Sequence, residues 1–183
     1  MFDPGQEYAG QTVLLTGGLG FLGSIVLEHL LRLTDVEKVY LLVRSKRHLS
    51  ARQRVENMLC SPLFNMLHAD ARKGIRNVFT RVHAVNGDLA LPGMGLSADD
   101  AAAVQQEVTA IIHCAALIEL DAPIQKTLQA NYMGTRNLLQ LASSMPGLRA
   151  FVHTSTYFVL NHVPRGSVAR RWSLSRRRPR QLT

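Results

Sequence analysis

The sequence predicts an α/β fold in which a parallel sheet is covered by helices on both faces. Short apolar runs, which are typical of buried strands, alternate along the chain with stretches whose apolar residues recur at helical spacing. The first of these runs ends in a cluster of glycines at the start of a helical pattern. The 183 residues suffice for one domain, and 46% hydrophobic against 19% charged residues exclude a chain kept unfolded by its charge.

Five apolar runs are expected to form strands. Each is four or five residues long, which suits a strand that is buried on both faces. The runs are residues 12–15, 39–43, 82–85, 110–113 and 151–154.

Three helical regions lie between these runs. The first covers residues 21–33, where leucine, isoleucine and valine recur on one face. A polar helical region is expected over 50–67. A third helix is expected over 124–143, closed by the turn residues Pro146 and Gly147.

The net charge of +8 is concentrated at the C-terminus. Seven arginines lie between residues 165 and 180 without an acidic residue, whereas residues 1–164 carry the other 14 basic residues against all 13 acidic ones. An arginine-rich tail can bind nucleic acid or an anionic membrane. We favour a solvated, disordered end, and we rank nucleic-acid binding below the functions considered next.

Neither a disulfide framework nor an N-terminal targeting signal is expected. Cys60 and Cys114 lie in apolar surroundings, where buried free thiols in a reducing compartment are expected. The N-terminus has an acid and a proline where a secretory signal carries basic residues. The uncharged stretch 11–27 contains four glycines in 17 residues, whereas a membrane span needs about 20 apolar residues.

The strongest local motif is TGGLGFLG, which places three glycines at intervals of three between the first strand and the first helix. Gly17 permits a sharp turn, Gly20 lets the backbone approach a pyrophosphate, and Gly23 allows the helix to pack closely on the strand. The amides at the helix start can then bind phosphate. The motif predicts a dinucleotide-binding site, and with it a Rossmann-type fold, which is a doubly wound parallel sheet. The cofactor-binding residues expected here are Thr16, Gly17, Gly20, Phe21, Leu22 and Gly23.

The spacing TGxxGxxG resembles the short-chain dehydrogenase/reductase superfamily, and in particular its extended branch. Arg44 follows the second strand, where NAD-dependent enzymes usually carry an acid that binds the ribose 2′-hydroxyl. An arginine there suits a 2′-phosphate instead. We therefore predict NADP (NADPH) as the cofactor, with Lys46 or Arg47 as helpers.

The resemblance implies further cofactor-binding residues after the third and fourth strands. An aspartate and a leucine resemble the adenine contact, and a run of small residues resembles the motif that lies beneath the cofactor. These residues are Asp88, Leu89, Cys114, Ala115 and Ala116. His113 is predicted to be a core histidine, because no partner ligand lies at helical spacing from it, and no metal site is expected.

The resemblance also implies three residues with catalytic roles. Asn131, in NYMGTRNLL, resembles the helix asparagine that supports the proton relay in this superfamily. The sequence HTST at 153–156 ends the fifth strand where the superfamily has its catalytic hydroxyl. Thr156 is the first choice for that hydroxyl and Ser155 the second.

Within the branch, the resemblance narrows to the alcohol-forming fatty acyl-CoA reductases. YLLVRSK, SPLF, GDLALPGMGLS, IIHCAALIELDAP, NYMGTRNLL and FVHTST resemble that family in order, over about residues 12–166. The resemblance implies NADPH-dependent reduction of a long acyl-CoA, through a bound aldehyde, to a primary alcohol in lipid metabolism. It also implies a peroxisomal or endoplasmic reticulum membrane surface, although a cytosolic location is expected for this chain. Thioester reductase domains are close relatives and stay open as an alternative.

The sequence departs from the superfamily at the proton donor, which is a tyrosine followed four positions later by a lysine. The chain has Tyr8, Tyr40, Tyr132 and Tyr157, with Thr12, Arg44, Arg136 and Asn161 at those later positions. We therefore expect an enzyme that is catalytically incomplete as it stands. A non-catalytic NADP-binding or partner-binding fragment is the alternative.

The organisation expected from these observations has three parts. Residues 1–11 form an N-terminal lead, residues 12–167 an incomplete NADP-binding domain truncated after about the fifth strand, and residues 168–183 a disordered basic tail. The arginine, serine and proline bias of the tail is typical of a shifted reading frame. A truncated gene model or splice form is expected.

Overall fold

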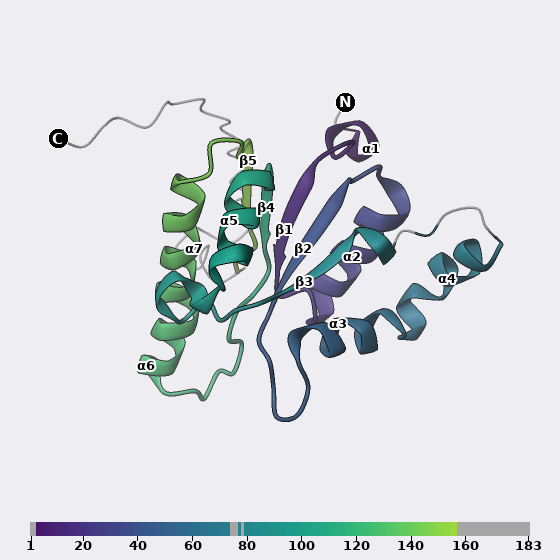
Figure 1. Ribbon diagram of the computed structural model, residues 1–183. Coiled ribbons are helices and arrows are strands. Elements are labelled where there is room, and N and C mark those ends of the chain that lie inside the picture. Colours follow the sequence, from purple (N-terminus) through teal and green to yellow (C-terminus); the bar gives the residue numbers. More distant parts are fainter. Residues whose placement is uncertain (1–2, 74–76, 78, 157–183) are drawn as a thin grey trace, which may run out of the picture.

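The computed structural model describes residues 3–73, 77 and 79–156, and the strands of this part form one parallel sheet (Figure 1). The strand order is β3-β2-β1-β4-β5. The strands are β1 (Thr12–Thr16), β2 (Lys38–Val43), β3 (Val82–Asn86), β4 (Ala110–His113) and β5 (Ala150–His153). The predicted tail, 168–183, and the last part of the predicted domain, 157–167, lie outside the described residues.

The order of the strands reverses between β1 and β4. From β1 the chain continues to β2 and β3 on one side, and it returns to pair β4 with the other side of β1. Thr16, at the carboxyl end of β1, is aligned with Leu42 of β2 and His113 of β4. Open parallel sheets bind their ligands at such a reversal, outside the carboxyl ends of the strands. The predicted doubly wound, Rossmann-type fold is confirmed.

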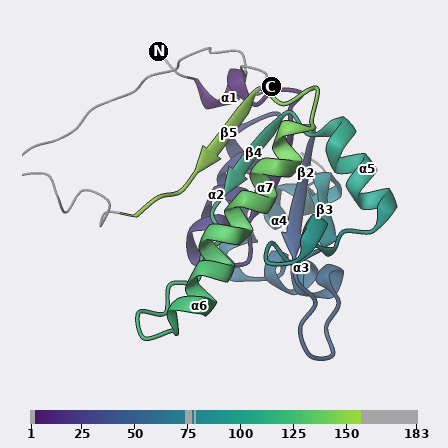
Figure 2. The same ribbon diagram turned by 90° about the vertical axis from the view of Figure 1, so that its left-hand side faces the viewer.

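Helices cover both faces of the sheet (Figures 1 and 2). The longer ones are α2 (Phe21–Leu33), α3 (Ala51–Leu59), α4 (Asn65–Arg72), α5 (Ala98–Glu107) and α7 (Gly134–Ser143). Side chains of β1 alternate between two buried clusters: Val13 and Leu15 pack with α2, α3 and α4, whereas Leu14 packs with α5 and α7. Both faces of β1 are therefore buried, as its apolar run predicts.

Shorter elements connect these layers. They are the helices α1 (Pro4–Glu7) and α6 (Ile124–Thr127), the 3-10 turns η1 (Pro62–Phe64), η2 (Phe79–Arg81) and η3 (Pro92–Gly95), and the π-helical segment η4 (Leu128–Met133). Each predicted strand lies within one residue of its observed bounds, and α2 has the predicted bounds.

The polar helical region predicted over 50–67 is helical, but it is divided into α3, η1 and the start of α4. A capping box between Ser50 and Gln53 starts α3, but the helix ends before Pro62. Proline lacks an amide hydrogen and disfavours helical geometry at the preceding residue, so the chain turns there and resumes as α4. The helix predicted over 124–143 forms with η4 inside it, and α5 is an additional helix.

Cys60 is not the buried thiol that its apolar neighbours predict. It follows the last residue of α3 and is exposed, because the helix ends at the surface. Cys114 is half-buried after β4. Within the described ranges, no helix has the length and apolar character needed to cross a bilayer.

Phe64 anchors the turn between α3 and α4 and is fully buried in the core. Phe64→Ala should lower the free energy of unfolding by about 3–5 kcal/mol, because it removes a large side chain and leaves a cavity. Urea unfolding followed by circular dichroism measures the loss. Leu63→Ala, at a neighbour that is 39% exposed, is the control and should cost less than about 1 kcal/mol. Equal losses would contradict the core position of Phe64.

Candidate functional site

A groove runs along the carboxyl ends of the strands. It consists of two adjoining hollows of about 590 and 550 Å³, whose walls share Arg44, Arg54, Gly87 and Asp88. The larger hollow is lined by residues 16–20 after β1, 114–117 after β4 and two residues of η4. The groove therefore begins at the reversal of strand order and extends across the ends of β2 and β3.

The glycine loop after β1 forms a tight floor for the groove. Gly17 has a φ of 72°, in the left-handed region that favours glycine. A Cβ on Gly23 would lie 2.7 Å from the carbonyl carbon of Gly17, so the helix packs against the loop only because that residue is glycine. A Cβ on Gly20 would meet Gly17 O at 3.2 Å. The predicted turn and close packing are present, and the approach of a pyrophosphate to Gly20 stays a prediction.

The start of α2 offers backbone donors beside this loop. Its N-cap is Gly20, and among the described residues no side chain caps the helix and no acid lies in its first turn. The first amides of a helix lack intrahelical acceptors and carry the positive end of its dipole. The Phe21 side chain is 87% exposed, and neither Phe21 nor Leu22 lines the groove. The predicted ligand contacts of these two residues would therefore come from their backbone amides.

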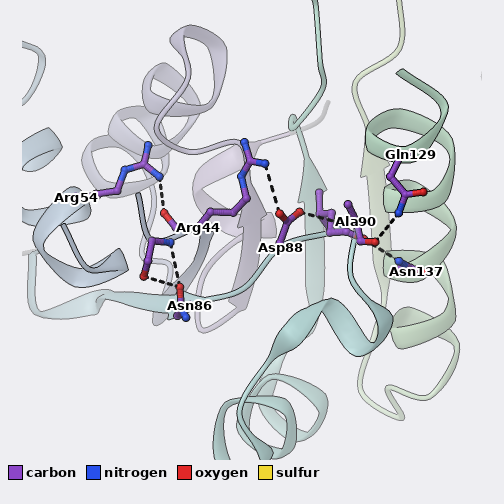
Figure 3. A network of polar contacts seen from close by, with 9 residues as sticks. Arg44, Arg54, Asn86, Asp88, Ala90, Gln129 and Asn137 are labelled. Atoms are coloured by element: carbon purple, nitrogen blue, oxygen red, sulfur yellow. Dashed lines mark hydrogen bonds and ion pairs between the residues drawn. The ribbon is translucent and has the colours of Figure 1, made fainter. Parts of the chain in front are cut away.

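Basic and acidic side chains meet at the far end of the groove (Figure 3). Arg44 Nη1 lies 3.4 Å from Asp88 Oδ2, and the Arg44 side chain is 70% exposed. The other carboxylate oxygen of Asp88 accepts a hydrogen bond from the Ala90 amide at 3.0 Å. The structure thus brings together two predicted site residues that are 44 positions apart.

Arg54 is a groove residue that the sequence reasoning missed. It lies in α3, and its Nη1 donates to the carbonyl oxygen of Arg44 at 2.5 Å (Figure 3). Lys46 also lines the smaller hollow, whereas Arg47 does not and has a φ of 55° in a tight turn. The basic character of 44–54 is visible in the sequence, but the position of Arg54 depends on the packing of α3.

The predicted residue Asn131 lies in the π-helical segment η4. The Leu117 amide donates to its Oδ1 at 2.7 Å, and its Nδ2 donates to the Leu117 carbonyl at 2.9 Å. Asn131 thereby holds the loop after β4, which forms one wall of the groove. π-helical turns occur frequently at functional sites. A role of Asn131 in proton relay stays a prediction.

His113 is buried at the end of β4, as predicted for a core histidine. Its Nδ1 lies 2.6 Å from Thr16 Oγ1 and its Nε2 lies 2.9 Å from Thr135 Oγ1. Burial, and to a smaller degree the nearby His153 ring, lowers the pKa of His113 to about 4. At neutral pH the imidazole is therefore uncharged.

The predicted hydroxyl residues follow β5. The Thr154 amide donates to the His113 carbonyl at 3.0 Å, and Thr154 Oγ1 lies 3.4 Å from Cys114 Sγ. Ser155 and Thr156 are exposed beyond this point and do not line the groove. Their catalytic role stays a prediction. Among the described residues, no three His, Cys, Asp or Glu side chains gather in a way that could hold a metal ion.

The low pKa of His113 predicts a loss of stability in acid. An unfolded histidine takes up its proton near pH 6.5 but the folded one near pH 4, so the unfolded state binds more protons in this window. The contribution of neutral His113 is complete above pH 6.5 and is lost as the pH falls to 4, by about 2–3 kcal/mol. Urea unfolding at a series of pH values measures it.

His113→Gln should flatten this pH dependence, because glutamine has no proton to take up. His48→Gln, at an exposed histidine, is the matched control and should keep the wild-type profile. An unchanged profile in His113→Gln would contradict the assignment.

Three comparisons with known proteins agree with this geometry. The family model described as Male sterility protein matches residues 15–177. Fatty acyl-CoA reductase wat of Drosophila melanogaster is 35% identical over 151 residues, and human fatty acyl-CoA reductase 1 is 38% identical over 154 residues. These matches cover 82% and 84% of this chain but only 28% and 29% of the two relatives. The chain thus spans less than a third of the length of these relatives.

Solved reductase domains share the fold. The terminal R domain of the myxalamid PKS-NRPS pathway is 35% identical, with a TM-score of 0.65 over 81% of this chain and 35% of that domain's chain. The R domain of a nonribosomal peptide synthetase from Mycobacterium tuberculosis is 28% identical, with a TM-score of 0.63 over 82% and 34%. Together with the glycine loop at the reversal of strand order, these likenesses identify a nicotinamide-nucleotide-binding reductase fold. The chain belongs to the Male sterility protein family, and it is an oxidoreductase-family relative of the fatty acyl-CoA reductases.

Proposed function

We propose that the groove binds NADP(H), and that longer proteins built on this domain use it to reduce long-chain acyl-CoA to primary alcohol. The observation that carries the proposal is the uncapped start of α2 beside the glycine loop, at the reversal of strand order. That arrangement suits a diphosphate, because backbone amides and the helix dipole both favour negative charge. We further propose that such longer proteins act at peroxisomal or endoplasmic reticulum membrane surfaces.

The residues present fit a nicotinamide dinucleotide along the whole groove. The diphosphate would lie against the glycine loop and the first amides of α2, which no side chain in the described structure caps. The adenosine would lie across the ends of β2 and β3, near Asp88 and Leu89. The small residues Cys114, Ala115 and Ala116 line the remaining wall. When bound, the cofactor would supply a hydride to a carbonyl carbon.

A preference for NADP over NAD is supported by two guanidinium groups. Arg44 is largely exposed and its contact with Asp88 is long, so it can turn to a 2′-phosphate at little cost. Arg54 lies behind it and reaches the Arg44 carbonyl. Arginine binds phosphate through paired hydrogen bonds. NAD-dependent enzymes usually have an acid after the second strand, which would repel the phosphate, and this chain has Arg44 there instead.

The arginine pair predicts cofactor selectivity. Arg44→Ala and Arg54→Ala should each weaken NADPH binding by about 10- to 100-fold, the loss of a hydrogen bond to a charged group, and should leave NADH binding nearly unchanged. Fluorescence titration with both nucleotides measures it.

Arg52→Ala is the matched control for this titration. Arg52 lies in the same helix and is 84% exposed, but it pairs with Glu56 away from the groove. Its removal should change neither affinity. A wild-type chain that prefers NADH would contradict the 2′-phosphate argument.

NADP binding and carbonyl reduction depend on different residues. Reduction of a carbonyl needs a proton for the developing oxyanion, and none of the tyrosines has a lysine four positions later. A non-catalytic NADP-binding or partner-binding role is therefore a second candidate for the chain itself. A thioester reductase activity, as in the R domains that share the fold, is a third candidate for the longer protein.

Because no tyrosine has a lysine four positions later, we predict that the 183-residue chain reduces nothing at a useful rate. NADPH consumption with a long-chain acyl-CoA, followed by absorbance at saturating nucleotide, should not exceed the control without protein. The reason is the absence of a positioned acid, a contribution of about 10²–10⁴-fold. Consumption that depends on both protein and acyl-CoA would show that another group donates the proton.

A further inference from the structure

His113 joins three parts of the fold through a continuous chain of hydrogen bonds. Its ring lies between Thr16 at the end of β1 and Thr135 in the first turn of α7. The Thr135 hydroxyl reaches the Asn131 carbonyl in η4 at 2.6 Å. The Thr16 hydroxyl also accepts from the Ala115 amide at 3.3 Å. Through one hydroxyl on each side, the ring is therefore connected to the Ala115 amide in the wall after β4 and to the Asn131 carbonyl in η4.

The direction of each hydrogen bond follows from the groups involved. The Asn131 carbonyl can only accept, so the Thr135 hydroxyl donates to it and must accept from His113 Nε2. The Ala115 amide can only donate, so Thr16 Oγ1 accepts from it. The hydroxyl hydrogen of Thr16 is then free to point at His113 Nδ1. The Thr135 end requires a proton on Nε2, and a Thr16 hydroxyl that donates to a bare Nδ1 agrees with the same neutral tautomer.

A second proton on the ring would break this arrangement. Nδ1 would become a donor, and the Thr16 hydroxyl, which is fully buried, would need another acceptor. The aromatic rings that face His113 offer no negative charge: His153 stacks on it at 5.0 Å between ring centroids, and Phe151 approaches at 6.4 Å. The lowered pKa of His113 agrees with this geometry.

Residues 114–117, at the wall after β4, have no space to move toward the glycine loop. A Cβ on Gly17 would lie 2.6 Å from Ala115 N, so the two backbones are already in contact. On the other side, Asn131 holds Leu117 by two hydrogen bonds. The position of 114–117 is therefore set by the His113 network at one end and by Asn131 at the other.

We propose that neutral His113 is a positioning residue, which fixes the 114–117 wall against the glycine loop and so sets the affinity of the groove for its dinucleotide. The proposal rests on the nucleotide site proposed above. His113 acts through Thr16 and Thr135 and does not itself line the groove.

Thr135→Val removes the acceptor of His113 Nε2 without changing the size of the side chain, and it tests the proposal with the full chain. NADP⁺ should bind about tenfold more weakly by calorimetry, because one buried donor loses its partner. Thr135→Ser keeps the hydroxyl and should bind within about twofold of wild type. Thr127→Val is the control, since Thr127 also bonds the carbonyl four residues earlier but contacts no histidine in the described structure.

The outcomes separate this inference from the nucleotide site itself. A wild-type chain that binds neither NADP⁺ nor NAD⁺ overturns both. Binding by wild type with equal affinity in Thr135→Val overturns the positioning role alone, even if thermal unfolding shows a less stable variant. Loss of affinity in Thr135→Val with recovery in Thr135→Ser supports it.

Nitrogen-15 NMR of the histidine rings gives a second readout that does not depend on ligand binding. The signal of His113, assigned by its absence in His113→Gln, should report a protonated Nε2 and a bare Nδ1 at pH 7. A proton on Nδ1, or on both nitrogens, overturns the proposal.

Discussion

Between β1 and β4 the backbone leaves space for a hydrogen atom and little else. A Cβ on Gly17 would lie 2.6 Å from Ala115 N, and its φ of 72° already selects glycine at this turn. This contact places the start of the glycine loop against the segment after β4, and α2 packs on the same residue, since a Cβ on Gly23 would lie 2.7 Å from the carbonyl carbon of Gly17. The uncapped start of α2 and the wall after β4 take their places from it. The groove is a consequence of two segments that meet nearly one hundred positions apart in the chain.

Buried polar groups maintain that meeting point. Thr16, His113 and Thr135 satisfy one another's hydrogen bonds, and no buried side-chain nitrogen or oxygen in the described part of the chain lacks a partner. A satisfied network in a region of low dielectric is rigid, because breaking any one bond leaves a buried polar group unpaired. The glycine loop thus has no space for a larger side chain at Gly17, and the segment after β4 is held by buried hydrogen bonds.

The sequence predicts the strands and the glycine loop well because their causes are local. The apolar runs of β1, β2 and β4 are buried, whereas β3 and β5, at the two ends of the described sheet, are partly exposed. Glycine spacing reflects turn geometry that a few residues decide. Arg54 and the break at Pro62 show where local reasoning stops. The helical pattern over 50–67 contains Pro62. Proline disfavours helical geometry at the residue before it, here Ser61, and this effect divides α3 from α4. Arg54 reaches the groove because α3 packs beside β2 and β3, which periodicity does not specify.

Nucleotide binding and proton transfer make different demands on a chain. Binding needs one turn, one helix start and a few small residues at the ends of neighbouring strands, all of which lie within residues 16–117. Proton transfer needs a group with a suitable pKa held at one atom of the substrate, and neither Ser155 nor Thr156 has a lysine in the part of the chain that follows. The fold and its groove therefore meet the requirements of nucleotide binding, whereas the proton donor is a separate requirement that the groove does not fix.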